Sequence, residues 1–309
     1  MTEQELLQER TAKWRLDGRP IRTLEDAQEF IESVGFCLMY PERVPVHVPT
    51  FIGAYVGADD RLPKQQHAYA DPRAEAATEL MVRLLRSKAA YEANLFGENV
   101  FLVSASVFPF FYALVGDRNP KQMPKPGTRS EYSPLAREIF EVIRQGPASK
   151  PRLAEKLGKG VTDAALDRAL NELWSRLRIT RVDYKPQEGG IWDVLYRWSP
   201  EAVREAINLS VPEALSALVS KYLDCIIAAD QEEVGDFFSH FVGRARVNEA
   251  VNALLAAREL QFVQIGTRPA IQVTPPKPLP KPRNAAPQEI RPKSGQPLVP
   301  RDKRRPIKK

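Results

Sequence analysis

The chain has 309 residues, 43% of them hydrophobic, and a formal net charge of +6. This length usually corresponds to two or three domains, and this apolar content is enough to bury their cores. No run of about eighteen apolar residues occurs, and no apolar stretch follows the charged start, so neither a membrane span nor an export signal is expected. Cys37 and Cys225 fall in different expected domains, so we expect no disulfide framework and a reducing, cytoplasmic compartment.

The first 118 residues are expected to form a helical, winged-helix-like domain. Thr23 with Asp26 predicts a helix that ends at Gly35 and buries Leu24, Ala27, Phe30, Ile31 and Val34. Asp71 with Pro72 predicts a second helix, with an apolar side made of Leu80, Met81, Leu84 and Leu85. Residues 99–115 indicate a buried strand or helix, and the proline-rich residues 119–132 indicate a linker.

The outer side of the second helix carries Arg73, Arg83 and Arg86. Arg83 and Arg86 are candidates for contacts with the phosphate groups of a nucleic acid. Exposed helix faces are also commonly basic for solubility alone, so both interpretations stay open.

Residues 133–200 have the pattern of a winged helix, which is three helices followed by a hairpin. Ser133 with Pro134 predicts the first helix, which ends at Gly146, and a short second helix should reach about Gly158. Thr162 predicts the start of a third, whose apolar stripe is Leu166, Leu170, Leu173, Trp174 and Leu177. Residues 179–184 and 191–198 predict two strands, joined by a turn at Gly189 and Gly190.

Residues 201–274 repeat this pattern. Ser210 with Glu213 predicts one helix start, and Asp230 with Glu233 predicts the next. A third helix carries an apolar stripe, and strands at 262–265 and 271–273 follow it around a turn at 267–269; the stripe is Val247, Val251, Leu254 and Leu255. Two such units in tandem predict a mostly α (α+β) fold with short hairpin wings that binds nucleic acid.

The third helix of a winged helix enters the major groove, so its solvent side would contact DNA. In 133–200 this side offers Arg168, Asn171 and Arg176, beside Asp163 and Asp167, which phosphate would repel. In 201–274 it offers a set that matches guanine and adenine edges better: Arg244, Arg246, Asn248 and Asn252. Double-stranded DNA is therefore the expected partner, with the second set contributing more. Protein binding, which winged helices also perform, is the alternative.

The basic charge is concentrated at the C-terminal end. From Gln272 onward, eleven Lys and Arg against two acidic residues give +9, which leaves −3 for the first 271 residues. Residues 275–309 also hold ten of the 27 prolines and no aromatic residue, so we expect a disordered tail. Its polybasic end, 301–309, suits diffuse contact with a phosphate backbone or serves solubility alone.

The layout of the chain resembles that of a known enzyme family. A helix ending in Gly35-Phe36-Cys37-Leu38 is followed by the Val-Pro-Val-His-Val segment, an aromatic stretch and two winged helices. Over roughly residues 20–275 this order is similar to the tandem winged-helix family of crosslink-repair DNA glycosylases, the AlkZ/YcaQ type. The resemblance implies DNA repair, in which active members remove alkylated or crosslinked bases. Their Gln-x-Gln or Gln-x-Asp pair positions and activates a water for attack at the sugar.

In this chain that catalytic pair aligns with Leu38 and Tyr40. Leucine has no polar atom, and a tyrosine hydroxyl with an ordinary pKa near 10 is a poor base at neutral pH. Glu42 is a possible substitute carboxylate, although a single acid on a loop is more often solvated. His47 falls near the His/Arg segment of the family and is either a phosphate contact or a surface histidine.

No phosphate loop, dinucleotide fingerprint or metal motif occurs, so neither a metal nor another cofactor is expected. We interpret the chain as a DNA-binding, repair-related and nucleoid-associated relative of these glycosylases in which the catalytic pair is replaced. Two alternatives stay open: an active DNA glycosylase that uses other residues, and a transcriptional or architectural DNA-binding factor without catalysis.

Removing residues 275–309 should weaken non-specific DNA binding and leave thermal unfolding unchanged. Each neutralised phosphate contributes about 0.9 to the salt slope on duplex DNA, so contact by about four or five tail cations predicts a slope flatter by roughly four units. Titrations of the full and shortened proteins over a range of salt concentrations measure this slope. An unchanged slope would mean that the tail does not contact DNA.

Overall fold

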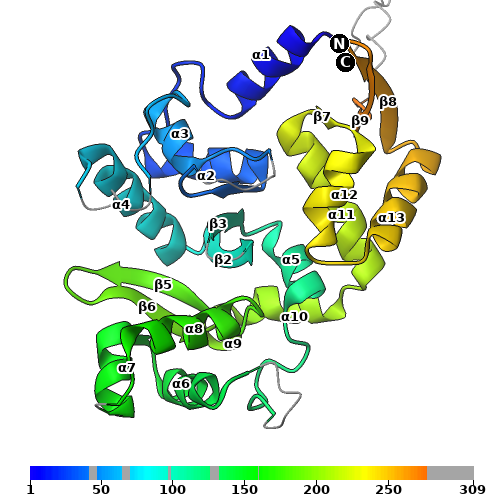
Figure 1. Ribbon diagram of the computed structural model, residues 1–309. Coiled ribbons are helices and arrows are strands. Elements are labelled where there is room, and N and C mark those ends of the chain that lie inside the picture. Colours follow the sequence, from blue (N-terminus) through cyan, green and yellow to red (C-terminus); the bar gives the residue numbers. More distant parts are fainter. Residues whose placement is uncertain (42–46, 65–69, 97–98, 126–131, 159, 277–309) are drawn as a thin grey trace, which may run out of the picture. The chain divides into compact units, whose positions relative to one another are not determined.

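The computed structural model describes residues 1–41, 47–64, 70–96, 99–125, 132–158 and 160–276, and in it the same order of elements recurs three times (Figure 1). Each time a helix, a short strand, two helices and a two-stranded hairpin follow one another. The short strand pairs with the second hairpin strand, in antiparallel sheets ordered β1-β3-β2, β4-β6-β5 and β7-β9-β8. Helices with small antiparallel hairpins are the expected α+β combination.

The first unit follows a leading helix, α1 (Glu3–Lys13), and comprises α2 (Leu24–Val34), β1 (Phe36–Leu38), α3 (Phe51–Val56), α4 (Pro72–Arg86), β2 (Ala90–Phe96) and β3 (Asn99–Ser104). Both predicted helix starts are confirmed, because Thr23 caps α2 and Asp71 caps α4. Gly35 ends α2 with a φ of +81°, and a side chain there would collide with Lys221. The Lys221 ammonium instead donates to the last carbonyl groups of α2.

The predicted buried stretch 99–115 contains both a strand and a helix, since α5 (Phe108–Val115) follows β3. The middle unit then comprises α6 (Pro134–Gln145), β4 (Ala148–Ser149), α7 (Lys150–Leu157), α8 (Asp163–Trp174), β5 (Ile179–Lys185) and β6 (Gly189–Val194). Ser133 and Thr162 cap α6 and α8 as predicted.

Two details of the predicted middle hairpin are wrong. Gly189 and Gly190 do not form its turn, which falls at 186–188, but lie within β6. A side chain at Gly190 would meet Arg181 at 2.7 Å, so this glycine makes room for packing. Residues 195–198 are the short helix α9 (Leu195–Trp198), because Val194 already pairs with the first residue of β5 and no strand partner remains beyond it.

The third unit follows α10 (Pro200–Asn208) and comprises α11 (Val211–Ile226), β7 (Ala228–Ala229), α12 (Gln231–Ser239), α13 (Arg244–Ala256), β8 (Leu260–Ile265) and β9 (Arg268–Val273). Ser210 and Glu213 form the predicted capping box of α11. Asp230 caps α12 by accepting from the Glu233 amide at 2.8 Å.

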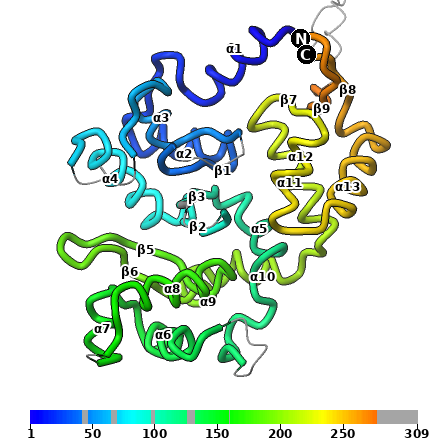
Figure 2. Tube along the Cα trace, viewed as in Figure 1, coloured from blue at the N-terminus to red at the C-terminus, as the bar shows by residue number. Residues whose placement is uncertain are grey.

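An aromatic core joins the first and third units. The Phe36 ring lies 5.2 Å from that of Phe111, 5.6 Å from Phe237 and 6.4 Å from Tyr222, and all four side chains are fully buried. Figure 2 shows α5 beside α11, which it contacts. Residues Met1–Thr274 accordingly form one compact unit. The domain boundaries expected at 118, 132 and 200 stay predictions, and the tail beyond Pro276 lies outside the described residues.

The expected linker is packed against the middle unit where the structure describes it. Arg178, buried just after α8, donates to the carbonyl of Gln122 at 2.6 Å and to the Tyr132 hydroxyl at 3.2 Å. It also pairs with Asp117, which follows α5. These bonds hold α8 next to the end of α5.

A buried ion pair joins β2 to the middle unit. The Glu92 carboxylate, 1% exposed, lies 2.7 Å from the Arg181 guanidinium and accepts from the Tyr184 hydroxyl at 2.9 Å. Its main-chain carbonyl accepts from Thr180 at 2.6 Å and from the Trp174 indole at 3.2 Å. Burial raises the pKa of the Glu92 carboxyl, and Arg181 and Tyr184 oppose that rise. The edge of the first sheet is therefore closed by the middle unit.

In the described part of the chain, we find no helix with the length and apolar character needed to cross a membrane. Cys37 and Cys225 are buried free thiols. Burial raises the pKa of the Cys225 thiol to about 12 and that of Cys37 well above its ordinary value. Both thiols are therefore protonated and unreactive at neutral pH.

Replacing Arg181 by Met should lower the free energy of unfolding by about 3 kcal/mol at neutral pH, because it leaves Glu92 buried without a cation. Adding Glu92→Gln should recover most of that loss, since glutamine carries no charge. A raised folded-state pKa means that stability is retained at low pH and lost as the pH rises through that pKa. The deficit of the single variant should therefore shrink in acid.

Urea unfolding of the two single variants, the double variant and the parent protein at several pH values measures these effects. Additive losses in the double variant would contradict the assigned pairing.

Candidate functional site

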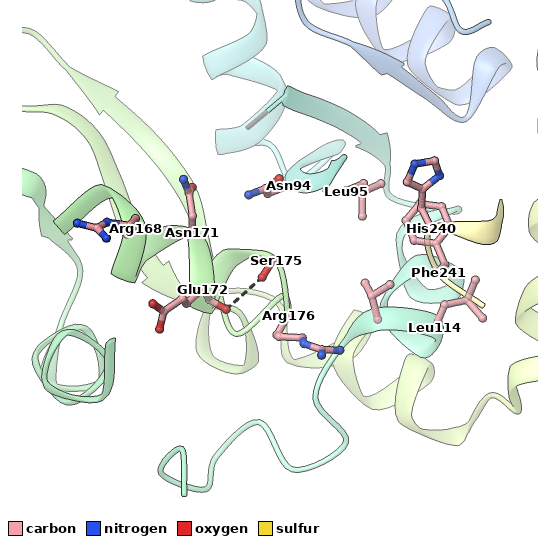
Figure 3. Close-up of a pocket in the computed structure, with 11 residues that line it drawn as sticks. Asn94, Leu95, Leu114, Arg168, Asn171, Glu172, Ser175, Arg176, His240 and Phe241 are labelled. Atoms are coloured by element: carbon pink, nitrogen blue, oxygen red, sulfur yellow. Dashed lines mark hydrogen bonds between the residues drawn. The ribbon is translucent and has the colours of Figure 1, made fainter. Parts of the chain in front are cut away.

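Three segments far apart in the sequence line one cavity of about 640 Å³, called here the α8 cavity (Figure 3). The helix α8 and the turn after it form one wall, β2 forms another, and the ends of α5 and α12 form a third. Its lining residues are Asn94, Leu95, Leu114, Val115, Arg168, Asn171, Glu172, Ser175, Arg176, His240 and Phe241.

The helix α8 turns a polar side toward this cavity. Four residues of its predicted apolar stripe are confirmed, each at most 4% exposed: Leu166, Leu170, Leu173 and Trp174. Leu177 is also buried, but it lies beyond the end of the helix at Trp174. Residues three or four apart share a helix face, so Arg168, Asn171 and Ser175 lie together on another side. Arg176 follows in the turn. The three DNA-binding candidates predicted in 133–200 thus line a single cavity.

Two acidic side chains near these arginines have partners of their own. Asp167 lies 2.8 Å from the Lys150 ammonium. The Glu172 carboxylate accepts from the main-chain N–H of Ser133 at 2.7 Å, which anchors the start of α6. The repulsion of phosphate expected from this helix is therefore weakened at Asp167, whereas Asp163 is exposed in its first turn.

Leu95 lines the cavity beside Asn94 because of a β-bulge. The pairing of β2 with β3 is regular up to Asn94 and Val100, after which the register shifts and leaves Leu95 as the extra residue. Successive strand residues normally point to opposite faces, but a bulge re-aims them, and both Asn94 and Leu95 line the cavity. In Figure 3 the amide nitrogen of Asn94 points toward Asn171.

The Asn94 side chain is 6% exposed, and its Oδ1 has no hydrogen-bond partner within the described structure. A buried polar atom without a partner costs free energy and calls for an explanation. Asn94 is therefore the feature of this cavity that packing alone does not account for.

His240 lies at the opposite wall, at the end of α12. Its Nδ1 is 3.0 Å from the Asp236 carbonyl oxygen and 3.3 Å from that of Phe237. A carbonyl oxygen can only accept, so Nδ1 carries a proton and Nε2 of the neutral ring is an acceptor. The Phe96 ring meets the imidazole edge-on, with centroids 4.9 Å apart. His240 thus presents an oriented acceptor at the exposed rim.

Arg83 and Arg86 line a different cavity, of about 910 Å³, between α4 and the β5–β6 hairpin. Arg86 lies 2.7 Å from the carboxylate of Asp183. The carboxylates of Glu75 and Glu79 line the same space, and their charge would oppose a phosphate group there. These two arginines are therefore separated from the α8 set.

The four candidates on α13 do not all point freely to solvent. Arg244 pairs with Asp236 of α12, and the Asn248 amide oxygen accepts from Gln231 at 3.4 Å. Arg246 and Asn252 are exposed. These contacts weaken the expectation from sequence that the α13 residues contribute more to DNA binding than the α8 residues.

The two positions at which the resemblance leads us to expect the catalytic pair lie in the core. Leu38 is 3% exposed in β1, and Tyr40 is 6% exposed with its hydroxyl 3.0 Å from that of Thr78. Glu42, the possible substitute, lies outside the described residues. His47 Nδ1 is 2.9 Å from the Glu233 carboxylate, so this histidine links the first unit to the third.

Sequence reasoning did not identify Asn94, His240 or Phe241 as site residues. The available signal for Asn94 was a strand-disfavouring residue within an otherwise well-formed strand. Among the residues that the structure describes, no three His, Cys, Asp or Glu side chains gather as a metal site would require. Amide, guanidinium and imidazole groups instead suit a ligand that carries hydrogen-bonding edges and negative charge.

Comparisons with known proteins give a family match and a solved structure of similar fold. The family model described as DNA glycosylase AlkZ-like matches residues 54–291. Among solved structures, the Streptomyces sahachiroi DNA glycosylase AlkZ is similar in fold, with a TM-score of 0.55 and 13% sequence identity, covering 89% of this chain and 70% of that one. A comparison with curated proteins found no match.

Replacing Leu38 by Gln, the residue that the resemblance leads us to expect there, should lower the free energy of unfolding by about 3 kcal/mol, because it buries an amide without a partner. Leu38→Met, of similar volume, should cost less than about 1.5 kcal/mol. Denaturant unfolding of both variants measures the difference. If Leu38→Gln were as stable as the parent, position 38 would be open to a polar environment.

Proposed function

The chain belongs to the AlkZ-like DNA glycosylase family, and on that premise we propose that it is a repair-related protein that binds double-stranded DNA. Such a role fits a cytoplasmic, nucleoid-associated location. The observation that carries the proposal is the convergence of Arg168, Asn171 and Arg176 with the buried amide of Asn94 on one cavity.

We also propose that the three repeated units are winged helices. Support comes from their shared order, in which the third helix precedes the hairpin: α4, α8 and α13. In a winged helix this third helix reads the major groove. Of the three, α8 has its arginines and an amide grouped at a cavity, so we assign it the main DNA contact.

Replacing Arg168 and Arg176 together by Ala should weaken duplex binding more than replacing Arg244 and Arg246 together. Arg244 is already paired with Asp236, whereas Asp167 beside Arg168 is occupied by Lys150. This reverses the order expected from sequence alone. The loss of two phosphate contacts should flatten the salt slope by roughly two units.

Anisotropy titrations with one duplex at several salt concentrations provide the measurement, and thermal unfolding of each double variant is the control for folding. Greater loss in the α13 variant would move the main DNA contact to the third unit.

Base excision from simple alkylated DNA should be at background level, because the aligned catalytic positions hold Leu38 and Tyr40, both in the core. Incubation of purified protein with alkylated and crosslinked duplexes, scored for abasic sites, tests this directly. Abasic sites above background that disappear in Glu42→Gln would make the carboxylate of Glu42 the catalytic group.

One arrangement favours a second candidate function, an active DNA glycosylase that uses other residues. The oriented Nε2 acceptor of His240 and the Asn94 amide line the same cavity, and such groups can hold a water and accept its proton. Excision activity that is lost in His240→Gln or Asn94→Leu, and retained in Glu42→Gln, would establish this function in place of the non-catalytic one.

A further inference from the structure

The floor of the α8 cavity holds a polar group with no structural use in the described chain. Asn94 is more than nine-tenths buried, lines the cavity, and leaves its Oδ1 without a partner. A leucine of similar size would fill the same strand position without this cost. An unsatisfied buried polar group calls for an explanation, and beside an open cavity a ligand can supply the missing partner.

The walls around Asn94 are suited to a flat, apolar-faced group. Leu95, Leu114 and Phe241 contribute apolar surface, and the Phe241 ring is held in place by Phe111, with centroids 5.7 Å apart. The volume of about 640 Å³ falls within the range of roughly 300–1,000 Å³ that small-molecule sites occupy. The cavity is therefore large enough for a heterocyclic base with its sugar.

Cationic groups lie on one wall of the same space, beside Glu172, whose carboxylate accepts from the main-chain N–H of Ser133. Arg168 and Arg176 are both exposed on the α8 side, where guanidinium groups can meet phosphate oxygens. A ligand with a phosphate at one end and a planar base at the other would meet arginines and then the Asn94 amide. Asparagine presents a donor and an acceptor together, which match the edge of adenine best among the bases.

We propose that the α8 cavity receives a single unpaired nucleotide of a DNA strand and that Asn94 recognises its base. This inference rests on the proposed DNA binding and adds a substrate class to it. A nucleotide already unpaired and unstacked costs less to bring into a cavity than one in a regular duplex. The protein should therefore prefer a duplex that carries a one-nucleotide bulge.

The test compares two labelled duplexes, one fully paired and one with a single bulged adenine, in titrations with the full-length protein. The parent protein should bind the bulged duplex at least about tenfold more tightly, and Asn94→Leu should bring that ratio close to one. The matched control is Asn208→Leu, an exposed asparagine on α10, which should keep the ratio. Asn171→Ala, on the facing wall, should lower it in part.

Thermal unfolding separates recognition from folding. Asn94→Leu removes an unpartnered buried amide, so its melting temperature should equal or exceed that of the parent. A residue with a purely structural role would give the opposite shift.

The outcomes distinguish this inference from the proposed function. Equal affinity of the parent for both duplexes, or an unchanged ratio in Asn94→Leu, overturns the nucleotide site while leaving DNA binding intact. Binding of neither duplex overturns the proposed function itself. A third titration uses free deoxyadenosine monophosphate. If this nucleotide binds to the parent protein but not to Asn94→Leu, and the two duplexes bind equally well, then the ligand of the cavity is a free nucleotide and a nucleotide within a DNA strand is excluded.

Discussion

The buried pair of Glu92 and Arg181 is the interaction on which the position of the α8 cavity depends. Glu92 and Asn94 are two residues apart on β2, so both side chains face the middle unit. The Glu92 carboxylate forms an ion pair with Arg181, and the Glu92 carbonyl accepts hydrogen bonds from Thr180 and Trp174. These bonds bring α8 against β2 and leave a space just beyond them, where the bulge begins. A hydrophobic contact could hold the same elements together, but it would not fix their register so closely.

The cavity is also the place where local rules of stability are broken. The regular ladder of β2 is interrupted, a strand carries an asparagine, and that asparagine lacks a partner for its oxygen. At the same junction Arg178 has hydrogen-bond partners, whereas Arg181 Nε, like Asn94 Oδ1, has none in the described chain. A bulge, an asparagine in a strand and an amide oxygen without a partner at one cavity favour a binding role for that cavity.

Much of the fold could be predicted because its signals are local. The caps at Thr23, Asp71, Ser133, Thr162 and Ser210 each depend on a side chain and an amide two or three residues away, and all are observed. The apolar stripe of α8 also predicted which of its residues would face outward. Sequence reasoning placed the middle hairpin turn at Gly189 and Gly190, because it could not see that glycine there makes room for Arg181.

The candidate site could be predicted only in part, for the same reason. Helix periodicity was enough to find Arg168, Asn171 and Arg176, but not to find Asn94 or His240 as their neighbours, since these join them only through contacts across the fold. Ion pairs such as that of Arg244 with Asp236 also cannot be predicted from sequence, and they change which cationic side chains are available to contact DNA.

The central claim is that DNA contacts the α8 side of the molecule. Amide hydrogen exchange of the full-length protein, with and without a duplex, tests it most directly. The account predicts that DNA slows exchange in 163–178 and around Asn94, with little change in α13. Protection confined to 244–256, with none in α8 or β2, would contradict it.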